Sequence, residues 1–271
     1  MMRRALVAIA LLLVASPAFA TWSIIAIDAN SGEIVIASAT CVPQGAFARF
    51  PAKGLMDVQA IIVPGRGVAA AQASVDSSRR NQTLIYEELR KGTDPQEILT
   101  MLSADPAFQS RQFAIVDQYG RGAAFSGERN GPVSLHKQGM IRAPGRRIYY
   151  SVQGNILRSE EVVTAAAAAF RTARGTLSDK VMAAMEAADA KGGDSRCSCA
   201  SAPKIDAPCT AKTSHVAYLL RSNRSDPLGT SYNDGTYAFY LSVTDADITP
   251  AEDANPVRTL RMRYEAWKKR R

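Results

Sequence analysis

The stretch TWSIIAIDANSGEIVIASAT, residues 21–40, decides the fold of this 271-residue chain. Two apolar, β-rich runs, 21–28 and 33–40, flank the short loop Ala29–Gly32, whose glycine can adopt a positive φ. Runs of this kind joined by a short loop are typical of a β-hairpin. The sequence therefore predicts a hairpin over residues 21–40.

The register of this hairpin places apolar side chains on both of its faces. A four-residue loop sets Ile27 opposite Ile34, to within one residue, and Ile25 and Ile36 follow on the same face. The other face is apolar as well and carries Trp22, Ile24, Ala26, Val35, Ala37 and Ala39. Because both faces are apolar, both should be covered by other parts of the chain.

Later in the chain, predicted hairpins alternate with pairs of predicted helices. The strand-like runs are 59–64, 67–74, 111–117, 121–128, 148–155, 213–222 and 236–243. The helical patterns are 78–91, a second helix that opens at Asp94, 159–173 with Ser159 as its N-cap, and about 178–191 with Ser178 at its start. Paired strands and paired helices favour stacked layers over a parallel doubly wound sheet. We therefore expect an α+β fold, a four-layer αββα sandwich with helices outside two sheets.

The same register gathers four hydroxyl groups at one end of the hairpin. Thr21 lies opposite Thr40 and Ser23 opposite Ser38, all on the Ile25 face. One interpretation is structural, with the hydroxyls facing solvent or bonding one another. The other is chemical, because a threonine that begins a mature chain brings its own base. An α-amine has an unperturbed pKa of about 8 and can accept the hydroxyl proton.

The residues before Thr21 have the pattern of a signal peptide. Two arginines precede the apolar run Ala5–Ala15, and Ala18-Phe19-Ala20 has the small-x-small form of a cleavage site. The apolar run is shorter than the about 20 residues that span a membrane, and no later segment approaches that length. We therefore expect residues 1–20 to be removed on export, so that a periplasmic or secreted protein begins at Thr21. A competing cut would follow Ala18.

Several motifs resemble a known family. They are TWSIIAIDANSGEIVIAS (21–38), GVAAAQASVD (67–76), Ala104-Asp105-Pro106, RQFAIVDQYGRGAAFSGE (111–128), YSVQGNIL (150–157) and GGDSR (192–196). In this order, over roughly 21–222, the chain resembles the domain of unknown function 1028 family, DUF1028. Members of that family are classed as N-terminal-nucleophile (Ntn) hydrolase-like. The resemblance implies the Ntn αββα fold and hydrolysis of an amide bond.

The chain departs from the family pattern at three places. The segment 41–58 is longer than the usual link, 195–212 is an added cysteine-bearing loop, and 223–271 has no counterpart that we can place. We therefore expect an Ntn-hydrolase-like domain over 21–250, with an insertion at 195–212, followed by a basic tail, 251–271. These departures bear on substrate specificity more than on the fold.

If the domain is an amidase, Thr21 is the nucleophile and its α-amine is the general base. Asn155 ends a strand just before a helix and is our candidate donor to the oxyanion, with a Gly-Asn corner as the structural alternative. Gln72 and Gln153 stand in otherwise apolar strands, either as site groups or as buried amides with backbone partners. The remaining candidates are Ser23, Ser38, Thr40 and, by analogy with a lysine of proteasome-type relatives, Lys53.

Two other polar pairs are expected to have structural roles. Asp28 and Glu33 flank the hairpin turn, at the far end from Thr21. Asp194 and Arg196 should pair and lock the loop before the last strands.

The charge distribution does not indicate a nucleic-acid binder. Of the formal net charge of +8, two positive charges lie in the leader, and residues 258–271 carry seven Lys or Arg and one Glu. The remaining body is neutral, whereas a nucleic-acid binder carries a basic face on its folded domain. The tail is expected to form a solvated amphipathic helix, with weak contact to an anionic membrane surface as the alternative.

Four cysteines, Cys41, Cys197, Cys199 and Cys209, are an even number in a chain with an export signal, which favours disulfides in one of three pairings. The alternative is a zinc site of three thiolates and His215, although the spacing fits no familiar zinc finger. With two histidines in the chain, a Ser-His-Asp triad has little support, and no phosphate loop or dinucleotide fingerprint is present. We expect no cofactor and no metal.

These features predict an exported Ntn-type hydrolase with a threonine nucleophile that acts on an amide bond of a small molecule or peptide. The alternative is a non-catalytic envelope protein that uses the same scaffold for binding or structure. The sequence does not specify the oligomeric state.

The exported protein should begin at Thr21, because the Ala-x-Ala site ends at Ala20. N-terminal sequencing or intact-mass measurement of the exported fraction reports this directly. A chain that begins at Phe19, or a blocked Thr21, would contradict the nucleophile hypothesis, since the hydroxyl would then have no α-amine on its own residue.

Overall fold

The computed structural model describes residues 21–48 and 54–270, so the expected signal peptide and Lys53 lie outside the described residues. The strands of a larger sheet are β1 (Thr21–Asp28), β2 (Ile34–Thr40), β7 (Leu135–Ala143), β8 (Arg146–Asn155), β9 (Val216–Ser222) and β10 (Phe239–Thr244). Those of a smaller sheet are β3 (Ala60–Val63), β4 (Gly67–Ala73), β5 (Arg111–Asp117) and β6 (Gly122–Ser126). The helices are α1 (Leu55–Gln59), α2 (Arg80–Lys91), α3 (Pro95–Leu102), α4 (Glu161–Thr172), α5 (Leu177–Ala190) and α6 (Pro256–Lys268).

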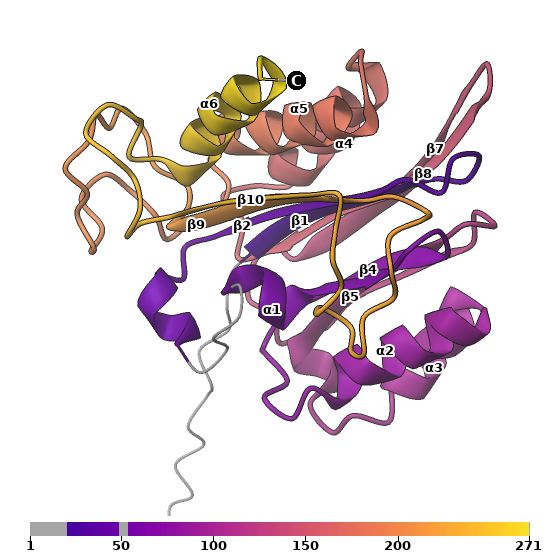
Figure 1. Ribbon diagram of the computed structural model, residues 1–271. Helices are drawn as coiled ribbons and strands as arrows, with labels where there is room; N and C mark the ends of the chain where they lie inside the picture. The colour runs from indigo at the N-terminus through magenta and orange to yellow at the C-terminus, as the bar shows by residue number, and fades with distance from the viewer. Residues whose placement is uncertain (1–20, 49–53, 271) are drawn as a thin grey trace, which may run out of the picture.

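Two antiparallel sheets lie face to face (Figure 1). The larger sheet has the strand order β10-β9-β2-β1-β8-β7, and the smaller has the order β3-β4-β5-β6. The β1–β2 hairpin has the predicted register, with Ile25 paired to Ile36 and Thr21 paired to Thr40. Since β8 pairs with the other edge of β1, the strand that begins at Thr21 lies inside the sheet.

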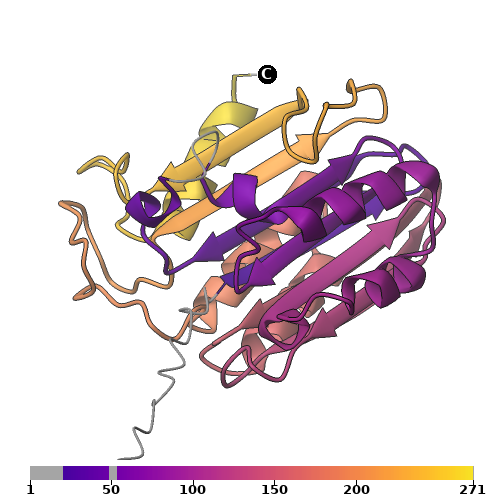
Figure 2. The ribbon, with the colours of Figure 1, turned by 90° about the horizontal axis from the view of Figure 1, so that it is seen from below.

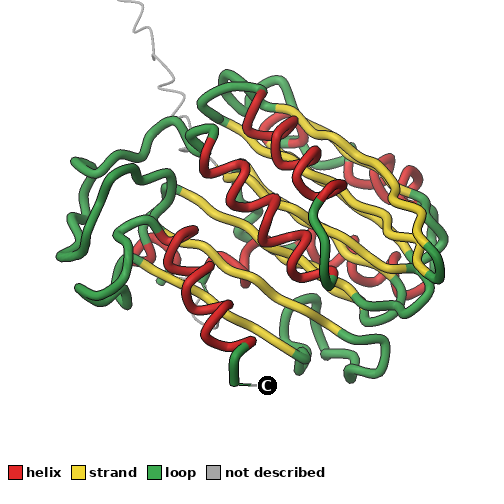
Figure 3. Tube along the Cα trace, turned by 90° about the horizontal axis from the view of Figure 1, so that it is seen from above, coloured by secondary structure: helices red, strands yellow, loops and turns green. Residues whose placement is uncertain are grey.

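Helices cover the outer faces of both sheets. Helices α2 and α3 lie over the smaller sheet (Figure 2), and α4, α5 and α6 lie over the larger one (Figure 3). Helix α4 illustrates why a helix packs on a sheet in this way, because its buried residues recur with helical spacing and form one apolar face. They are Val162, Val163, Ala166, Ala167 and Phe170. A separate apolar cluster fills the space between the sheets. The predicted mixed α+β class is confirmed, and both faces of the first hairpin are covered.

Strand β7 was not predicted from the sequence, and His136, expected in a loop, lies on it. Its sequence LHKQGMIRA lacks a regular alternation of apolar and polar residues and contains a central glycine. β7 is an edge strand with mostly exposed side chains, held by main-chain pairing to β8. An edge strand of this kind leaves little hydrophobic pattern in the sequence.

Two helices begin differently from the prediction. Ser159 is not the N-cap of α4, which begins at Glu161 without a side-chain capping bond. Helix α5 begins at Leu177, because Thr176 and Asp179 form a capping box just before the predicted Ser178 start. Whether a residue caps a helix therefore depends on whether its side chain bonds a main-chain N–H of the first turn, and not on residue type alone.

The cysteines form two disulfides, Cys41–Cys197 and Cys199–Cys209. This pairing is one of the three that the sequence left open. Because all four sulfurs are bonded in pairs, none of them is a thiolate ligand for zinc. No helix in the described part of the chain combines the length and apolar character of a membrane span.

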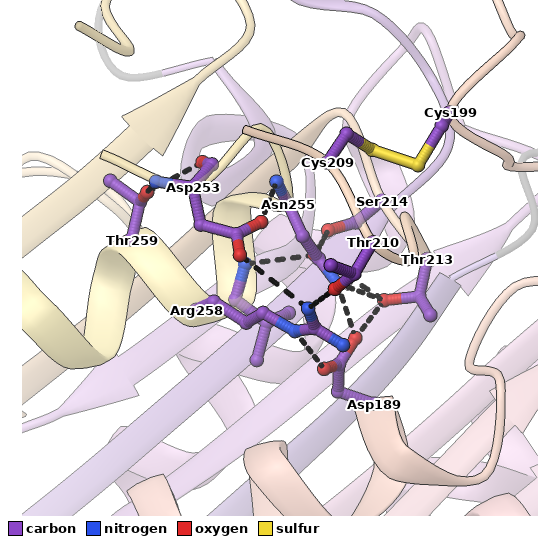
Figure 4. Close-up of polar contacts among 11 residues, drawn as sticks. Asp189, Cys199, Cys209, Thr210, Thr213, Ser214, Asp253, Asn255, Arg258 and Thr259 are labelled. Atoms are coloured by element: carbon purple, nitrogen blue, oxygen red, sulfur yellow. Dashed lines mark hydrogen bonds and ion pairs between the residues drawn. A yellow bond between two sulfur atoms is a disulfide. The ribbon is translucent and has the colours of Figure 1, made fainter. Parts of the chain in front are cut away.

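A polar cluster ties the cysteine-bearing loop 195–212 to the C-terminal helix (Figure 4). Asp189, at the end of α5, accepts hydrogen bonds from the hydroxyl of Thr213 and, at 2.6 Å, from Asn255 Nδ2. Asn255 is also the N-cap of α6. Arg258 on α6 contacts both Asp189 and Thr210 of this loop. Asp189 therefore anchors Thr213, directly after this loop, and α6, and Arg258 of α6 in turn bonds Thr210 of the loop.

One face of the basic C-terminal helix is buried. Val257, Leu260 and Tyr264 of α6 belong to the core cluster on the outer face of the larger sheet. On the same helix, Arg263 pairs with Glu252 at 2.7 Å and Lys268 pairs with Asp179 at 3.0 Å. Part of the tail's positive charge is therefore neutralised within the molecule, which weakens the expectation of contact with an anionic membrane.

Replacement of Asn255 tests the polar cluster at the start of α6. Asn255→Ala should lower the free energy of unfolding by about 2–3 kcal/mol, since it removes a helix cap and a donor to a buried carboxylate. Asp94→Ala is the matched control: Asp94 caps α3 before a proline but is partly exposed, so the loss should be about 1 kcal/mol. Urea unfolding measures both, and equal losses would show that the cluster adds nothing beyond capping.

Candidate functional site

The layer between the sheets is apolar at one end and polar at the other. On β1, Ile27 and Ile25 belong to the inter-sheet cluster, and Ser23 and Thr21 continue the same face. The polar side chains gathered at this end are each at most 5% exposed: Thr21, Ser23, Ser38, Thr40, Gln59, Gln72, Gln112, Gln153 and Asn155. Burying so many polar groups is costly unless they bond one another. A core built for stability alone would avoid that cost, so this end is the candidate site.

Thr21 is held from both neighbouring strands. Thr40 on β2 lies opposite it on one side and Asn155 on β8 lies opposite it on the other. The main-chain nitrogen of Thr21 donates to Asn155 Oδ1 at 3.2 Å, and its hydroxyl donates to Thr40 Oγ1 at 3.3 Å. The structure therefore brings two of the predicted site residues into contact with Thr21.

Gln72 on β4 joins the two sheets at the same point. Its Nε2 donates to the main-chain oxygen of Thr21 at 3.0 Å, and its Oε1 accepts from Ser23 Oγ at 2.7 Å. One carboxamide thus holds the first residue of β1 by its backbone and the third by its side chain.

Two further buried glutamines, absent from the predicted set, complete the cluster. Gln59 Nε2 donates to Gln72 Oε1 and Gln72 Nε2 donates to Gln112 Oε1, both at 2.7 Å. Gln112 Nε2 donates to the main-chain oxygen of Gly154, next to Asn155, at 2.9 Å. Gln112 interrupts an apolar strand as Gln72 does, so the same signal would have found it. Gln59 ends a short helix and has no comparable signal.

Ser38 and Gln153 have different surroundings from each other. The Ser38 hydroxyl donates to the main-chain oxygen of Trp22 at 2.7 Å, a bond within the hairpin that suits its structural interpretation. Gln153 Nε2 donates to Ser23 Oγ at 3.2 Å, which places Gln153 in the cluster. Its Oε1 is buried and has no hydrogen-bond partner among the residues that the structure describes.

Asp194 and Arg196 pair, as predicted, beside the same strand ends. Arg196 Nη2 lies 3.0 Å from Asp194 Oδ2, which also accepts from the main-chain nitrogen of Cys41 at 3.0 Å. Cys41 follows Thr40 directly, and its disulfide to Cys197 fastens the same segment. The ion pair therefore borders the site.

Burial favours the neutral form of both histidines. His215 Nδ1 lies 3.8 Å from Asp245 Oδ2, while burial, with the nearby charges of Lys212 and Arg196, lowers the pKa of His215 to about 4. Burial also lowers the pKa of His136. Across residues 21–48 and 54–270, no group of three or more His, Cys, Asp or Glu side chains is placed to hold a metal ion.

Comparison with known proteins assigns the family. A family model described as a family of unknown function, DUF1028, matches residues 21–227. The chain belongs to the DUF1028 family. Its structure is similar to the crystal structure of the protein SPO2555 from Silicibacter pomeroyi, also assigned to DUF1028, with a TM-score of 0.60 and 22% sequence identity. The likeness covers 91% of this chain and 88% of that chain. No curated protein matches the chain.

The DUF1028 match begins at Thr21 and contains every residue of the polar cluster around Thr21. Strand β10 and helix α6 follow the match and lie outside the part of the chain that the family model describes. At 22% identity, the likeness to SPO2555 concerns the fold alone.

A cavity of about 770 Å³ opens at the other end of β1 in this DUF1028 domain. Asp28, Glu33, Arg146, Arg221 and Arg224 are among the residues that line it. Asp28 pairs with Arg146 at 2.8 Å, which agrees with its assignment to the hairpin turn. None of the lining residues belongs to the cluster around Thr21.

Replacement of Gln72 tests the cluster that joins the sheets. Gln72→Met keeps much of the side-chain length but leaves buried partners on β1 and β5 unbonded, so we expect a loss of about 2–4 kcal/mol in unfolding free energy. Gln138→Met, on the exposed edge strand β7, should change stability by less than about 0.5 kcal/mol. Urea unfolding measures both. A loss for Gln72→Met no larger than that of the control would mean that the cross-sheet bonds contribute nothing to stability.

Proposed function

We propose that this DUF1028 protein is an exported N-terminal-nucleophile hydrolase that uses Thr21 to cleave an amide bond in a small molecule or peptide. The observation that carries the proposal is the placement of Thr21. It follows the expected cleavage site directly, and it heads an interior strand whose two neighbours bond its nitrogen and its hydroxyl. A terminus held in this way keeps the α-amine and the hydroxyl of Thr21 at a constant distance and orientation.

The proposed reaction has two steps. The α-amine accepts the proton of the Thr21 hydroxyl as the oxygen attacks the carbonyl carbon of the substrate amide. The C–N bond then breaks, the leaving amine takes the proton from the α-ammonium, and the acyl group remains on Thr21 as an ester. Water, deprotonated by the same amine, hydrolyses that ester and restores the hydroxyl.

Asn155 is the proposed donor to the oxyanion. Its Oδ1 accepts from the nitrogen of Thr21 at 3.2 Å, which holds the amide plane next to the nucleophile. The same amide carries the Nδ2 hydrogens, and a tetrahedral oxyanion is stabilised by such fixed donors. Thr40 and Gln72 are proposed to orient Thr21, through its hydroxyl and its carbonyl respectively.

The architecture supports the finer fold assignment, a four-layer αββα sandwich of the Ntn type. Helices, sheet, sheet and helices follow one another through the molecule (Figure 1), and the proposed nucleophile faces the layer between the sheets. The two disulfides are compatible with an oxidising compartment, and we therefore propose a periplasmic or secreted location.

Acylation of the mature protein tests the nucleophile. A small β-lactone, which acylates a nucleophilic oxygen by ring opening, should form an ester on Thr21, found by mass spectrometry on the tryptic peptide 21–49. Thr21→Ala should form no ester and Thr21→Ser should retain one. Asn155→Ala should slow acylation about 100- to 1000-fold, because one oxyanion donor contributes that much.

Ser31→Ala is the matched control, since Ser31 is an exposed hydroxyl on the same peptide. Its acylation rate should equal that of the wild type. A folded protein that begins at Thr21 but forms no adduct there would contradict the hydrolase and favour a non-catalytic binding or structural protein on the same scaffold.

A further inference from the structure

The segment 193–195 continues the larger sheet just beyond Thr21. Asp194 forms an isolated antiparallel bridge with Leu157, flanked by two main-chain hydrogen bonds of 3.0 and 3.1 Å between 193–195 and 156–158. The segment therefore pairs with the chain that follows β8, on the side where β1 lies.

The same segment contacts the end of β2. Asp194 Oδ2 accepts from the nitrogen of Cys41 at 3.0 Å. The oxygen of the same peptide group, that of Thr40, accepts from the nitrogen of His215 at 2.7 Å on the β9 side. Because the C=O and N–H of a trans peptide point in opposite directions, the Cys41 N–H points toward β1. Asp194 thus lies between the ends of β2 and β8, in line with β1.

The register gives the separation between Asp194 and Thr21. The partners of Thr21 are Thr40 on β2 and Asn155 on β8. Asp194 bonds Cys41, one position beyond Thr40, and forms a bridge with Leu157, two positions beyond Asn155. At about 3.4 Å per residue, it is about 3–7 Å farther along the sheet than Thr21. Gly193 supports this, since a Cβ on it would come within 2.6 Å of the Trp22 ring. The Asp194 side chain is 0% exposed, so little solvent screens its charge from Thr21.

We propose that the Asp194–Arg196 ion pair sets the protonation of the α-amino group that cleavage before Thr21 creates. This inference rests on the proposed function, because the α-amine is the base of the proposed reaction. The Asp194 carboxylate favours the ammonium form, and the Arg196 guanidinium opposes it. Together the two charges leave part of the amine unprotonated near neutral pH, as a general base requires. Asp194 and Arg196 are positioning residues in this scheme.

Other charged or titratable groups stand on the elements around this end of the sheets and stay unchanged in the test. They are Lys212, His215 and Asp245 near β9, Asp76, Asp105 and Arg111 near β4 and β5, and His136 on β7. Since the variants share these groups, a difference between their α-amine titration midpoints reports the effect of the ion pair.

Titration of the α-amine in the mature protein tests the inference. Trace labelling with acetic anhydride from about pH 5 to 10, followed by hydroxylamine to remove esters, measures the unprotonated amine. The tryptic peptide 21–49 contains no lysine, so its remaining acetylation counts the α-amine alone. Asp194→Asn should lower the midpoint by about one pH unit, and Arg196→Gln should raise it by about one unit. At about pH 6, labelling of the α-amine should then be about tenfold faster in Asp194→Asn and about tenfold slower in Arg196→Gln than in the wild type.

Two further variants separate charge from structure. Arg196→Lys keeps the charge and should titrate near the wild type. Asp28→Asn removes a matched carboxylate, paired with a partly exposed arginine and 4% exposed, at the far end of the same strand. It should leave the midpoint unchanged, because seven residues of strand, about 24 Å, exceed the screening length.

Opposite shifts for Asp194→Asn and Arg196→Gln support the inference. Shifts in the same direction, no shift, or an equal effect of Asp28→Asn would overturn it, since loosening of the fold has no reason to depend on the sign of the lost charge. The titration needs no substrate. Opposite shifts without an acyl adduct reject the hydrolase alone, an adduct without shifts rejects the ion-pair role alone, and a mature chain that begins elsewhere rejects both.

Discussion

Antiparallel pairing of β1 with both β2 and β8 holds Thr21 in the interior of the larger sheet, and the rest of the candidate site depends on this pairing. Strand pairing fixes which residues lie opposite one another, because a slip of one residue would turn every side chain to the other face. Here it sets a hydroxyl, Thr40, and a carboxamide, Asn155, on the two sides of the same threonine. An exposed edge strand could not hold its first residue from both sides.

The carboxamides between the sheets explain how this end of the core tolerates so many polar groups. Gln72 bonds the backbone of Thr21 from the smaller sheet, and Gln59 and Gln112 bond Gln72 in turn. Amides suit this task, since each carries donors and an acceptor and remains uncharged when buried. The cluster therefore makes the position of Thr21 depend on how the two sheets pack.

A disulfide, a carboxylate and the C-terminal helix reinforce the same end of the molecule. The disulfide from Cys41 and the carboxylate of Asp194 hold the start of the cysteine-bearing loop 195–212 against the end of β2. Asp189 then links Thr213, directly after that loop, to the C-terminal helix through Asn255 (Figure 4). These contacts thus brace the border of the proposed site, whose interior lies within the family match.

By itself, the sequence determined what short-range periodicity encodes: the first hairpin and its register, the mixed α+β class, and the four hydroxyls at one strand end. It also marked Gln72, because a polar residue interrupts an apolar strand, and Asn155, because it ends a strand just before a helix. It missed β7, whose exposed side chains leave no pattern. Only the tertiary structure decided that Asn155 adjoins Thr21, that Gln59 joins the cluster, and how the cysteines pair. Those contacts join residues up to 156 positions apart, and no local propensity encodes them until the sheet order brings the strands together.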